Sequence, residues 1–274
     1  MITKWLTSVA SFFKKLFKKD DAADDKNCNE TNTPVEDSSI DTTPEEAPKD
    51  EVVCSSCNHK QYPNLCVSCD PGHGSDTPGK CSPYVSSKDR LPALYFREYQ
   101  FSREIANMLK EELAKYGVEV YITVTEEKDV ALTTRYQRAN KFKEQHPDKK
   151  HVFVSIHANA AGNGQWMNAR GWSVYTTKGQ NNSDKLATCL YEAAEEILTP
   201  LGQKLRKDMS DGDPDYESNF TVIYGANMPA VLTENFFQDN VDDVKFLISD
   251  EGKKAIVDIH RKGILDYAEK YLDM

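Results

Sequence analysis

The stretch NLCVSCDPGHG, residues 64–74, places one histidine in a glycine-rich turn directly after a short apolar run. The run is typical of a β-strand, and the glycines beside His73 can adopt backbone angles that are closed to other residues. A histidine in such a turn can be a turn residue, a metal ligand or a catalytic base. Because a lone histidine after a strand is most often a turn or capping residue, its role depends on what the rest of the chain places beside it.

A strand followed by a helix is the repeating unit of the chain from about residue 64 onward. Strand-like runs rich in Val, Ile, Tyr and Phe lie at 64–69, 118–124, 151–157, 172–177, 220–224 and 230–235. Helix-like runs lie near 92–116, 130–145, 182–199 and 250–272. This alternation predicts a single three-layer α/β domain with a mostly parallel six-stranded sheet flanked by helices.

Ionisable residues stand at the ends of three of these strands. His73 follows the first strand, His157 ends HVFVSIH, and Glu234 ends AVLTEN, while Glu98 lies near the start of the first long helix. Sites in such sheets gather beyond the carboxyl ends of the strands. Two histidines and a carboxylate are a standard ligand set for a catalytic zinc ion. On the residues alone, either glutamate could be the oxygen ligand and the other a base, and a glutamate at a strand end can also simply be solvated.

The first 52 residues differ in composition from the rest. Residues 1–19 carry five lysines and no acid, with their apolar residues at helical spacing, which predicts a basic amphipathic helix. Residues 20–52 are rich in Asp and Glu and contain no aromatic residue, which predicts a disordered acidic linker. We expect the helix to contact a membrane surface or a protein partner, or alternatively to fold back onto the body.

Charge and hydropathy exclude several classes of protein. The chain of 274 residues has a net charge of −10, and residues 52–274 carry about −5, which argues against a nucleic-acid surface. It has no apolar run long enough for a transmembrane helix and no good secretory signal, so we expect synthesis in the cytoplasm. We also expect a monomer.

The seven cysteines do not describe a disulfide framework. Cys54, Cys57, Cys66 and Cys69 have the paired spacing of a structural zinc site. However, the last two fall three apart on a predicted strand and would point to opposite faces. Free thiols are therefore favoured over a second zinc ion or a local disulfide.

DPGHG, a glutamate opening a long helix, SIHAN and PAVLTENFFQDN occur in this order, and together they resemble the zinc-dependent N-acetylmuramoyl-L-alanine amidases. That family includes bacterial cell-separation amidases and phage endolysins. The resemblance runs from about Leu65 to Tyr271, which sets the expected catalytic domain at 53–274. It also implies a twisted six-stranded sheet.

The resemblance implies a role for each matching residue. His73, Glu98 and His157 match the zinc ligands and Glu234 the catalytic glutamate, so one catalytic Zn²⁺ is expected. Three further signature positions are interpreted as structural: Arg135, Asn140 and Asn240.

The implied reaction is hydrolysis of the amide between N-acetylmuramic acid and L-alanine in peptidoglycan. The missing secretion signal favours a phage or prophage endolysin acting on the cell wall. A host wall-remodelling autolysin and a non-catalytic adaptor with a degenerate amidase body are the alternatives, and the four intact site residues argue against the adaptor.

Overall fold

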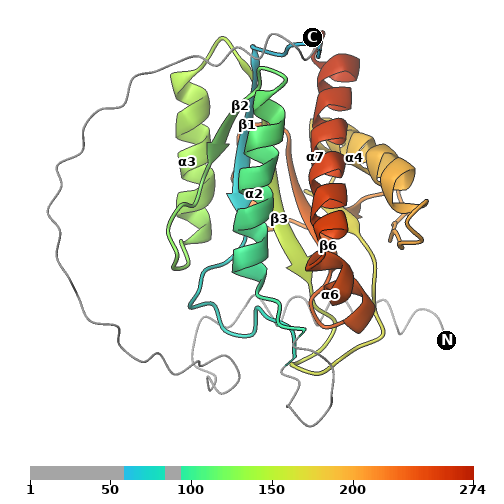
Figure 1. The fold of residues 1–274 in the computed structure, drawn as a ribbon. Helices are drawn as coiled ribbons and strands as arrows, with labels where there is room; N and C mark the ends of the chain where they lie inside the picture. Colours follow the sequence, from blue (N-terminus) through green and yellow to red (C-terminus); the bar gives the residue numbers. More distant parts are fainter. Residues whose placement is uncertain (1–58, 84–93) are drawn as a thin grey trace, which may run out of the picture. The chain divides into compact units, whose positions relative to one another are not determined.

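The computed structural model describes residues 59–83 and 94–274, so the predicted helix at 1–19 and linker at 20–52 lie outside the described residues. Strands and helices alternate along the described chain (Figure 1). The strands are β1 (Leu65–Pro71), β2 (Glu119–Ile122), β3 (Lys150–Asn159), β4 (Ser173–Thr176), β5 (Tyr216–Glu217) and β6 (Ala230–Phe237). The helices are α2 (Glu98–Ala114), α3 (Leu132–Gln145), α4 (Asn182–Leu198), α5 (Thr221–Tyr224), α6 (Val241–Leu247) and α7 (Asp250–Tyr271).

The strands form one six-stranded sheet in the order β2-β1-β3-β6-β4-β5. Neighbouring strands are parallel, except that β4 runs antiparallel to β6. The carboxyl ends of β1, β3 and β6 therefore meet at one edge of the sheet, which is where ligand sites form in such folds. The predicted three-layer architecture with a mostly parallel sheet is confirmed.

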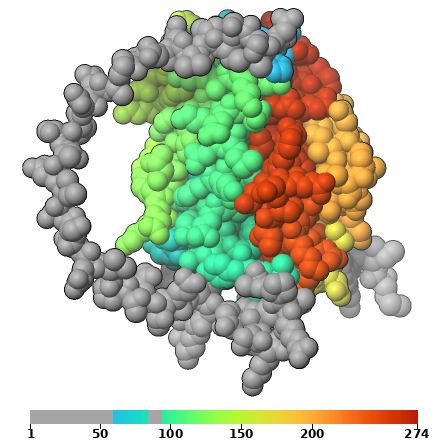
Figure 2. Space-filling model, viewed as in Figure 1, coloured from blue at the N-terminus to red at the C-terminus, as the bar shows by residue number. Residues whose placement is uncertain are grey.

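Helices cover both faces of the sheet. In β3, Val152, Val154 and Ile156 face a core cluster shared with α2, α4 and α7, whereas Phe153 faces a second cluster shared with α3 and α5. Successive side chains of a strand point to opposite faces, so this apolar run serves both layers. Helices α2 and α7 lie side by side over one face, and their surfaces are in contact in the space-filling view (Figures 1 and 2).

One predicted strand is wrong. Residues 220–224, FTVIY, form the short helix α5 instead, in which Val222 and Ile223 are buried in the second cluster beneath the sheet. β-Propensity reflects how well a residue fits a half-buried surface, and here packing against that cluster satisfies the same apolar side chains in a helical turn. The sheet still has six strands, because the two-residue strand β5 pairs with β4.

Among residues 59–83 and 94–274, no helix has the length and apolar character needed to cross a membrane.

Candidate metal centre

His73 lies in a strained turn directly beyond β1. Its backbone φ is 59°, in the left-handed region that non-glycine residues rarely adopt. The buried Arg135 side chain holds the turn: its Nη1 donates to the Pro71 carbonyl at 2.6 Å and its Nη2 to the His73 carbonyl at 3.3 Å. Arg135 Nη1 also pairs with the buried Asp70 carboxylate at 3.2 Å. Arg135 therefore fixes the backbone that presents His73.

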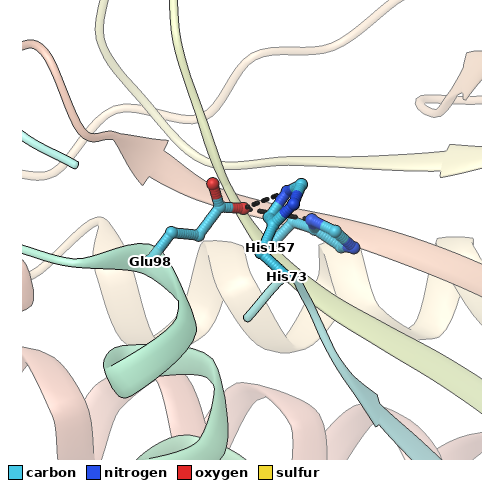
Figure 3. Close-up of side chains that lie close together, drawn as sticks. All are labelled: His73, Glu98 and His157. Atoms are coloured by element: carbon cyan, nitrogen blue, oxygen red, sulfur yellow. Dashed lines mark hydrogen bonds and ion pairs between the residues drawn. The ribbon is translucent and has the colours of Figure 1, made fainter. Parts of the chain in front are cut away.

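Glu98 is the first residue of α2, and its side chain is fully buried. Its Oε1 accepts from the Ala158 backbone N–H at 2.9 Å, lies 3.0 Å from His157 Nδ1 and 3.4 Å from His73 Nε2. Both imidazoles therefore meet the same carboxylate oxygen, as Figure 3 shows. The segment that follows β1, the start of α2 and the end of β3 converge at this point.

His157 and Glu234 belong to adjacent strands. They occupy the same register position in the parallel β3–β6 ladder. Asn235 supports the pair from behind, because its Nδ2 donates to the His157 carbonyl at 2.9 Å and its Oδ1 accepts from Trp172 Nε1 at 2.9 Å. The pairing brings Glu234 to the edge of the His–Glu–His group.

Burial sets the charge states of these groups. It lowers the pKa of His73 to about 4, which keeps the imidazole neutral. Burial opposes ionisation of Glu98, but nearby His73 and Lys80 hold its pKa well below the ordinary range. Burial raises the pKa of Glu234 to about 7, with His157 counteracting and Glu98 adding to the rise. One glutamate is thus held as a carboxylate, while the other is poised to exchange a proton near neutrality.

The donor set fits a metal ion. One ligand atom from each of His73, Glu98 and His157 lies within 4.8 Å of the others. Neutral imidazole nitrogens with one carboxylate oxygen suit Zn²⁺ in a catalytic site. Glu98 Oε2 is buried and, among the described residues, accepts no hydrogen bond. The residues present could therefore hold a metal ion.

The packing leaves no room for a side chain at Gly72. A Cβ there would lie 2.5 Å from His157 Cε1 and 2.6 Å from its Nδ1. The glycine is thus required by the close approach of the His157 ring to the turn.

Several residues that support the site carry no clear signal in the sequence. Lys80 Nζ lies 3.8 Å from Glu98 Oε2, and Ser102 Oγ donates to the Gly72 carbonyl at 2.9 Å. Asp70 is fully buried and accepts from Thr123 Oγ1 at 2.6 Å and from Ser155 Oγ at 2.7 Å. Asp70, the first residue of DPGHG, is the one of these that the sequence could have indicated. It follows an apolar strand directly, and a buried carboxylate there needs several hydrogen-bond partners.

The other signature residues have structural contacts. Asn140 bridges the Gly225 carbonyl and the Asn227 N–H, and Asn240 caps α6 by accepting from the Asp242 and Asp243 N–H groups.

Cys66 and Cys69 are buried free thiols. Cys69 lies in the larger core cluster, whereas Cys66 Sγ donates to Glu119 Oε2 at 3.8 Å. Cys54 and Cys57 lie outside the described residues.

The sequence profile of the N-acetylmuramoyl-L-alanine amidases matches residues 67–266, most of the chain. The chain belongs to the N-acetylmuramoyl-L-alanine amidase family. The matched range contains His73, Glu98, His157 and Glu234.

Individual amidases and endolysins are similar to this chain at modest identity. The endolysin of Bacillus phage SPP1 is 25% identical over 200 residues, covering 72% of this chain and 64% of its own length. The N-acetylmuramoyl-L-alanine amidase AmiC of Neisseria meningitidis is 26% identical over 236 residues, which cover 73% of this chain and 52% of AmiC. The amidase CwlM of Bacillus licheniformis is 29% identical over 197 residues, which cover 71% of this chain and 65% of CwlM. The chain therefore spans between half and two thirds of the length of these relatives.

Solved amidase structures share the fold. The N-acetylmuramoyl-L-alanine amidase from Clostridium difficile 630 superposes with a TM-score of 0.61 at 24% identity, covering 77% of this chain and 99% of that one. The catalytic domain of the CD27L endolysin, which targets Clostridia Difficile, gives a TM-score of 0.53 at 20% identity, covering 74% and 96%.

Proposed function

We propose that this amidase-family chain hydrolyses the amide joining N-acetylmuramic acid to L-alanine in peptidoglycan, with Zn²⁺ as cofactor. The observation that carries the proposal is the convergence of His73, Glu98 and His157 on one point, with Glu234 in register beside His157. The names of the amidase and endolysin relatives support the same bond and the same polymer.

His73, Glu98 and His157 would hold the zinc ion. When bound, Zn²⁺ supplies a Lewis acid that polarises a carbonyl oxygen and acidifies a water molecule. The burial that keeps His73 neutral leaves its nitrogen able to bind a metal. The strained turn and the Gly72 contact fix both imidazoles before any ion enters.

Glu234 would be the general base and then the general acid. Its carboxylate would take a proton from the attacking water and pass it to the nitrogen of L-alanine as the amide bond breaks. Burial raises the pKa of Glu234 to about 7, and the charge of a bound Zn²⁺ ion would oppose that rise and favour the carboxylate that accepts the first proton. The neighbouring Glu98 stays ionised and cannot replace it.

The products identify the bond. The chain, supplied with Zn²⁺, is added to purified sacculi, and new amino groups and new glycan ends are counted. We expect the turbidity of the sacculi to fall, L-alanine amino groups to appear and the glycan strands to stay uncut. Release of reducing sugar ends, or bound zinc without new amino groups, would contradict it.

We further propose that the chain acts as a phage or prophage endolysin. The relative from Bacillus phage SPP1 supports this role, whereas the bacterial relatives are consistent with a wall-remodelling enzyme. An endolysin made inside a bacterium should accumulate without lysis until the membrane is permeabilised, and then lyse the cells within minutes. Lysis that needs no permeabilisation would contradict the role.

Residues 53–274 are proposed as the catalytic domain, with residues 1–19 providing contact with a membrane or partner through the linker at 20–52. Co-sedimentation with anionic vesicles, comparing the full chain with one that starts near Glu51, tests the membrane contact. Equal sedimentation of both would contradict it.

A further inference from the structure

A second group of carboxylates lies away from the metal centre. One carboxylate oxygen from each of Asp184, Asp213 and Asp215 lies within 4.8 Å of the others. Asp184 is in the first turn of α4, and the other two precede the edge strand β5. These three residues, called here the Asp184 cluster, take no part in the proposed hydrolysis.

The sheet separates the Asp184 cluster from the catalytic residues. Strand β4 runs antiparallel to β6, and Ser173 at its start pairs with Glu234. Thr176, at the other end of β4, donates to Asp215 Oδ2 at 2.5 Å. Three residues of strand cover about 10 Å, so the cluster has its own place beyond the far end of β4.

Asp215 is buried with one oxygen unused. Its residue is only 1% exposed, and its Oδ1 has no hydrogen-bond partner among the described residues. Asp213 repeats the pattern: its Oδ2 accepts from Gln180 Nε2 at 2.8 Å, while its buried Oδ1 finds no partner in the described part of the chain. Buried carboxylate oxygens are costly unless a donor or a cation satisfies them.

No Lys or Arg of the described residues is paired with the group. Within residues 59–83 and 94–274, no Lys or Arg forms an ion pair with Asp184, Asp213 or Asp215. Lys185 lines the same surface pocket as Asp184 and Asp213, but its Nζ donates to Asn182 and lies over the Tyr271 ring. Among the described residues, the three carboxylates therefore have no paired cation, and the surface pocket reaches two of them, Asp184 and Asp213.

We propose that the Asp184 cluster binds Ca²⁺, as a second metal site that is separate from the catalytic one. The donor set is all oxygen, which suits a hard cation and differs from the His–Glu–His set. Ligand oxygens on opposite sides of a Ca²⁺ ion are about 5 Å apart, so the observed spacing can enclose one ion. The Thr176 hydroxyl already fixes one of the carboxylates in place.

The ion would stabilise the edge of the sheet at β5. Strand β5 pairs with β4 through only two residues, Tyr216 and Glu217, and the segment before it has little regular structure. An ion held by Asp213 and Asp215 on that segment and by Asp184 on α4 would tie the edge to the helix layer. The site would thus stabilise the fold without entering the reaction.

The alternative is a proton shared between Asp213 and Asp215. Burial, with Asp213 nearby, raises the pKa of Asp215 to about 7, so such a pair could form at neutral pH without any metal. The two alternatives differ in the effect of added calcium. A Ca²⁺ site predicts that calcium stabilises the fold, whereas a shared proton predicts no effect.

The test uses the full chain with its metal centre loaded with Zn²⁺, at pH 8, and CaCl₂ as the probe. Calorimetric titration should find one Ca²⁺ per chain, and the unfolding temperature should rise and saturate with added Ca²⁺. Asp213→Asn and Asp215→Asn should each weaken binding by about tenfold or more, because they remove a charged ligand. The control Asp211→Asn, an exposed position in the same segment with the same charge change, should bind as the wild type does.

A second readout covers variants that are altered in stability. In buffer that contains no Ca²⁺ and leaves the zinc bound, Asp215→Asn should unfold at a higher temperature than the wild type, because it relieves carboxylate repulsion. With Ca²⁺ the order should reverse. A wild type indifferent to Ca²⁺, or equal Ca²⁺ binding by the wild type and Asp215→Asn, would overturn the proposal. In that case a shared proton would explain the cluster.

Discussion

His157 and Glu234 stand at the same register position on adjacent parallel strands, one beside the candidate metal site and the other poised as a base. Their relative placement is therefore set by the backbone hydrogen bonds of the sheet rather than by a flexible loop. A register slip of one residue would turn every following side chain to the opposite face. The chemistry proposed for this chain depends on that ladder.

Gly72→Ala should lower metal affinity, because the added methyl would lie 2.5 Å from the His157 ring and displace it. Disturbing the orientation of a ligand typically costs about 10–100-fold in affinity. Competition with a zinc chelator measures the change. The control is Gly202→Ala, where a Cβ meets nothing within 4 Å but the backbone φ of 66° disfavours a side chain, so it should lower stability and keep wild-type metal affinity. Unchanged affinity in Gly72→Ala would show that the turn is not part of a metal site.

Arg135→Ala should destabilise the fold by about 3–5 kcal/mol, because it leaves the fully buried Asp70 carboxylate without its charged partner. The left-handed turn at His73 would also lose two donors to its carbonyls. Urea unfolding measures the change in the free energy of unfolding. The control on the same helix is Arg138→Ala, whose exposed pair with Glu126 should be worth about 1 kcal/mol or less. Equal losses in the two variants would contradict the role given to Arg135.

His260 should make the fold sensitive to acid. It is fully buried, its Nδ1 faces the Ile256 carbonyl at 2.7 Å, and its Nε2 lies 3.0 Å from Thr233 Oγ1. Burial lowers its pKa to about 4. An unfolded histidine binds a proton at about pH 6.5, so stability should fall as the pH drops from about 6.5 toward about 4, by about 3 kcal/mol at most.

Urea unfolding of the wild type and His260→Asn across that range isolates the contribution, because all other groups titrate in both proteins. The wild type should lose more stability on acidification than the variant does. Parallel pH profiles would show that His260 is not held neutral in the fold.

The strands that end near residues 69, 157 and 234 could be predicted from the sequence because each is a short, nearly continuous apolar run, as a parallel strand buried on both faces requires. His73, His157 and Glu234 could therefore be placed at one edge of a parallel sheet before any coordinates. Glu98 was a candidate from its place near the start of the first long helix, but choosing it over Glu234 as the ligand needed the family resemblance. Their predicted roles as ligands and base remain to be tested by experiment.

Contacts between distant segments could not be predicted in this way. The apolar residues of 220–224 satisfy a strand and a buried helical turn equally well, and only packing against β3 and β6 decides between them. The Asp184 cluster joins residues about thirty positions apart across the edge of the sheet, and nothing in the local pattern of Asp213 and Asp215 names Asp184 as a neighbour. The ion pair of Lys80 with Glu98 is hidden for the same reason.

The most direct measurement compares zinc content and the release of L-alanine amino groups from sacculi for the wild type, Glu234→Gln and His73→Ala. The account predicts one catalytic zinc in the wild type and in Glu234→Gln. It also predicts a rate about 100–10,000-fold lower in Glu234→Gln, because the proton carrier is lost while the ligands remain. His73→Ala should lose both zinc and activity. A strong chelator should inactivate the wild type, and added Zn²⁺ should restore its activity. A Glu234→Gln protein that cleaves at the wild-type rate, or a wild type that stays active without zinc, would contradict the account.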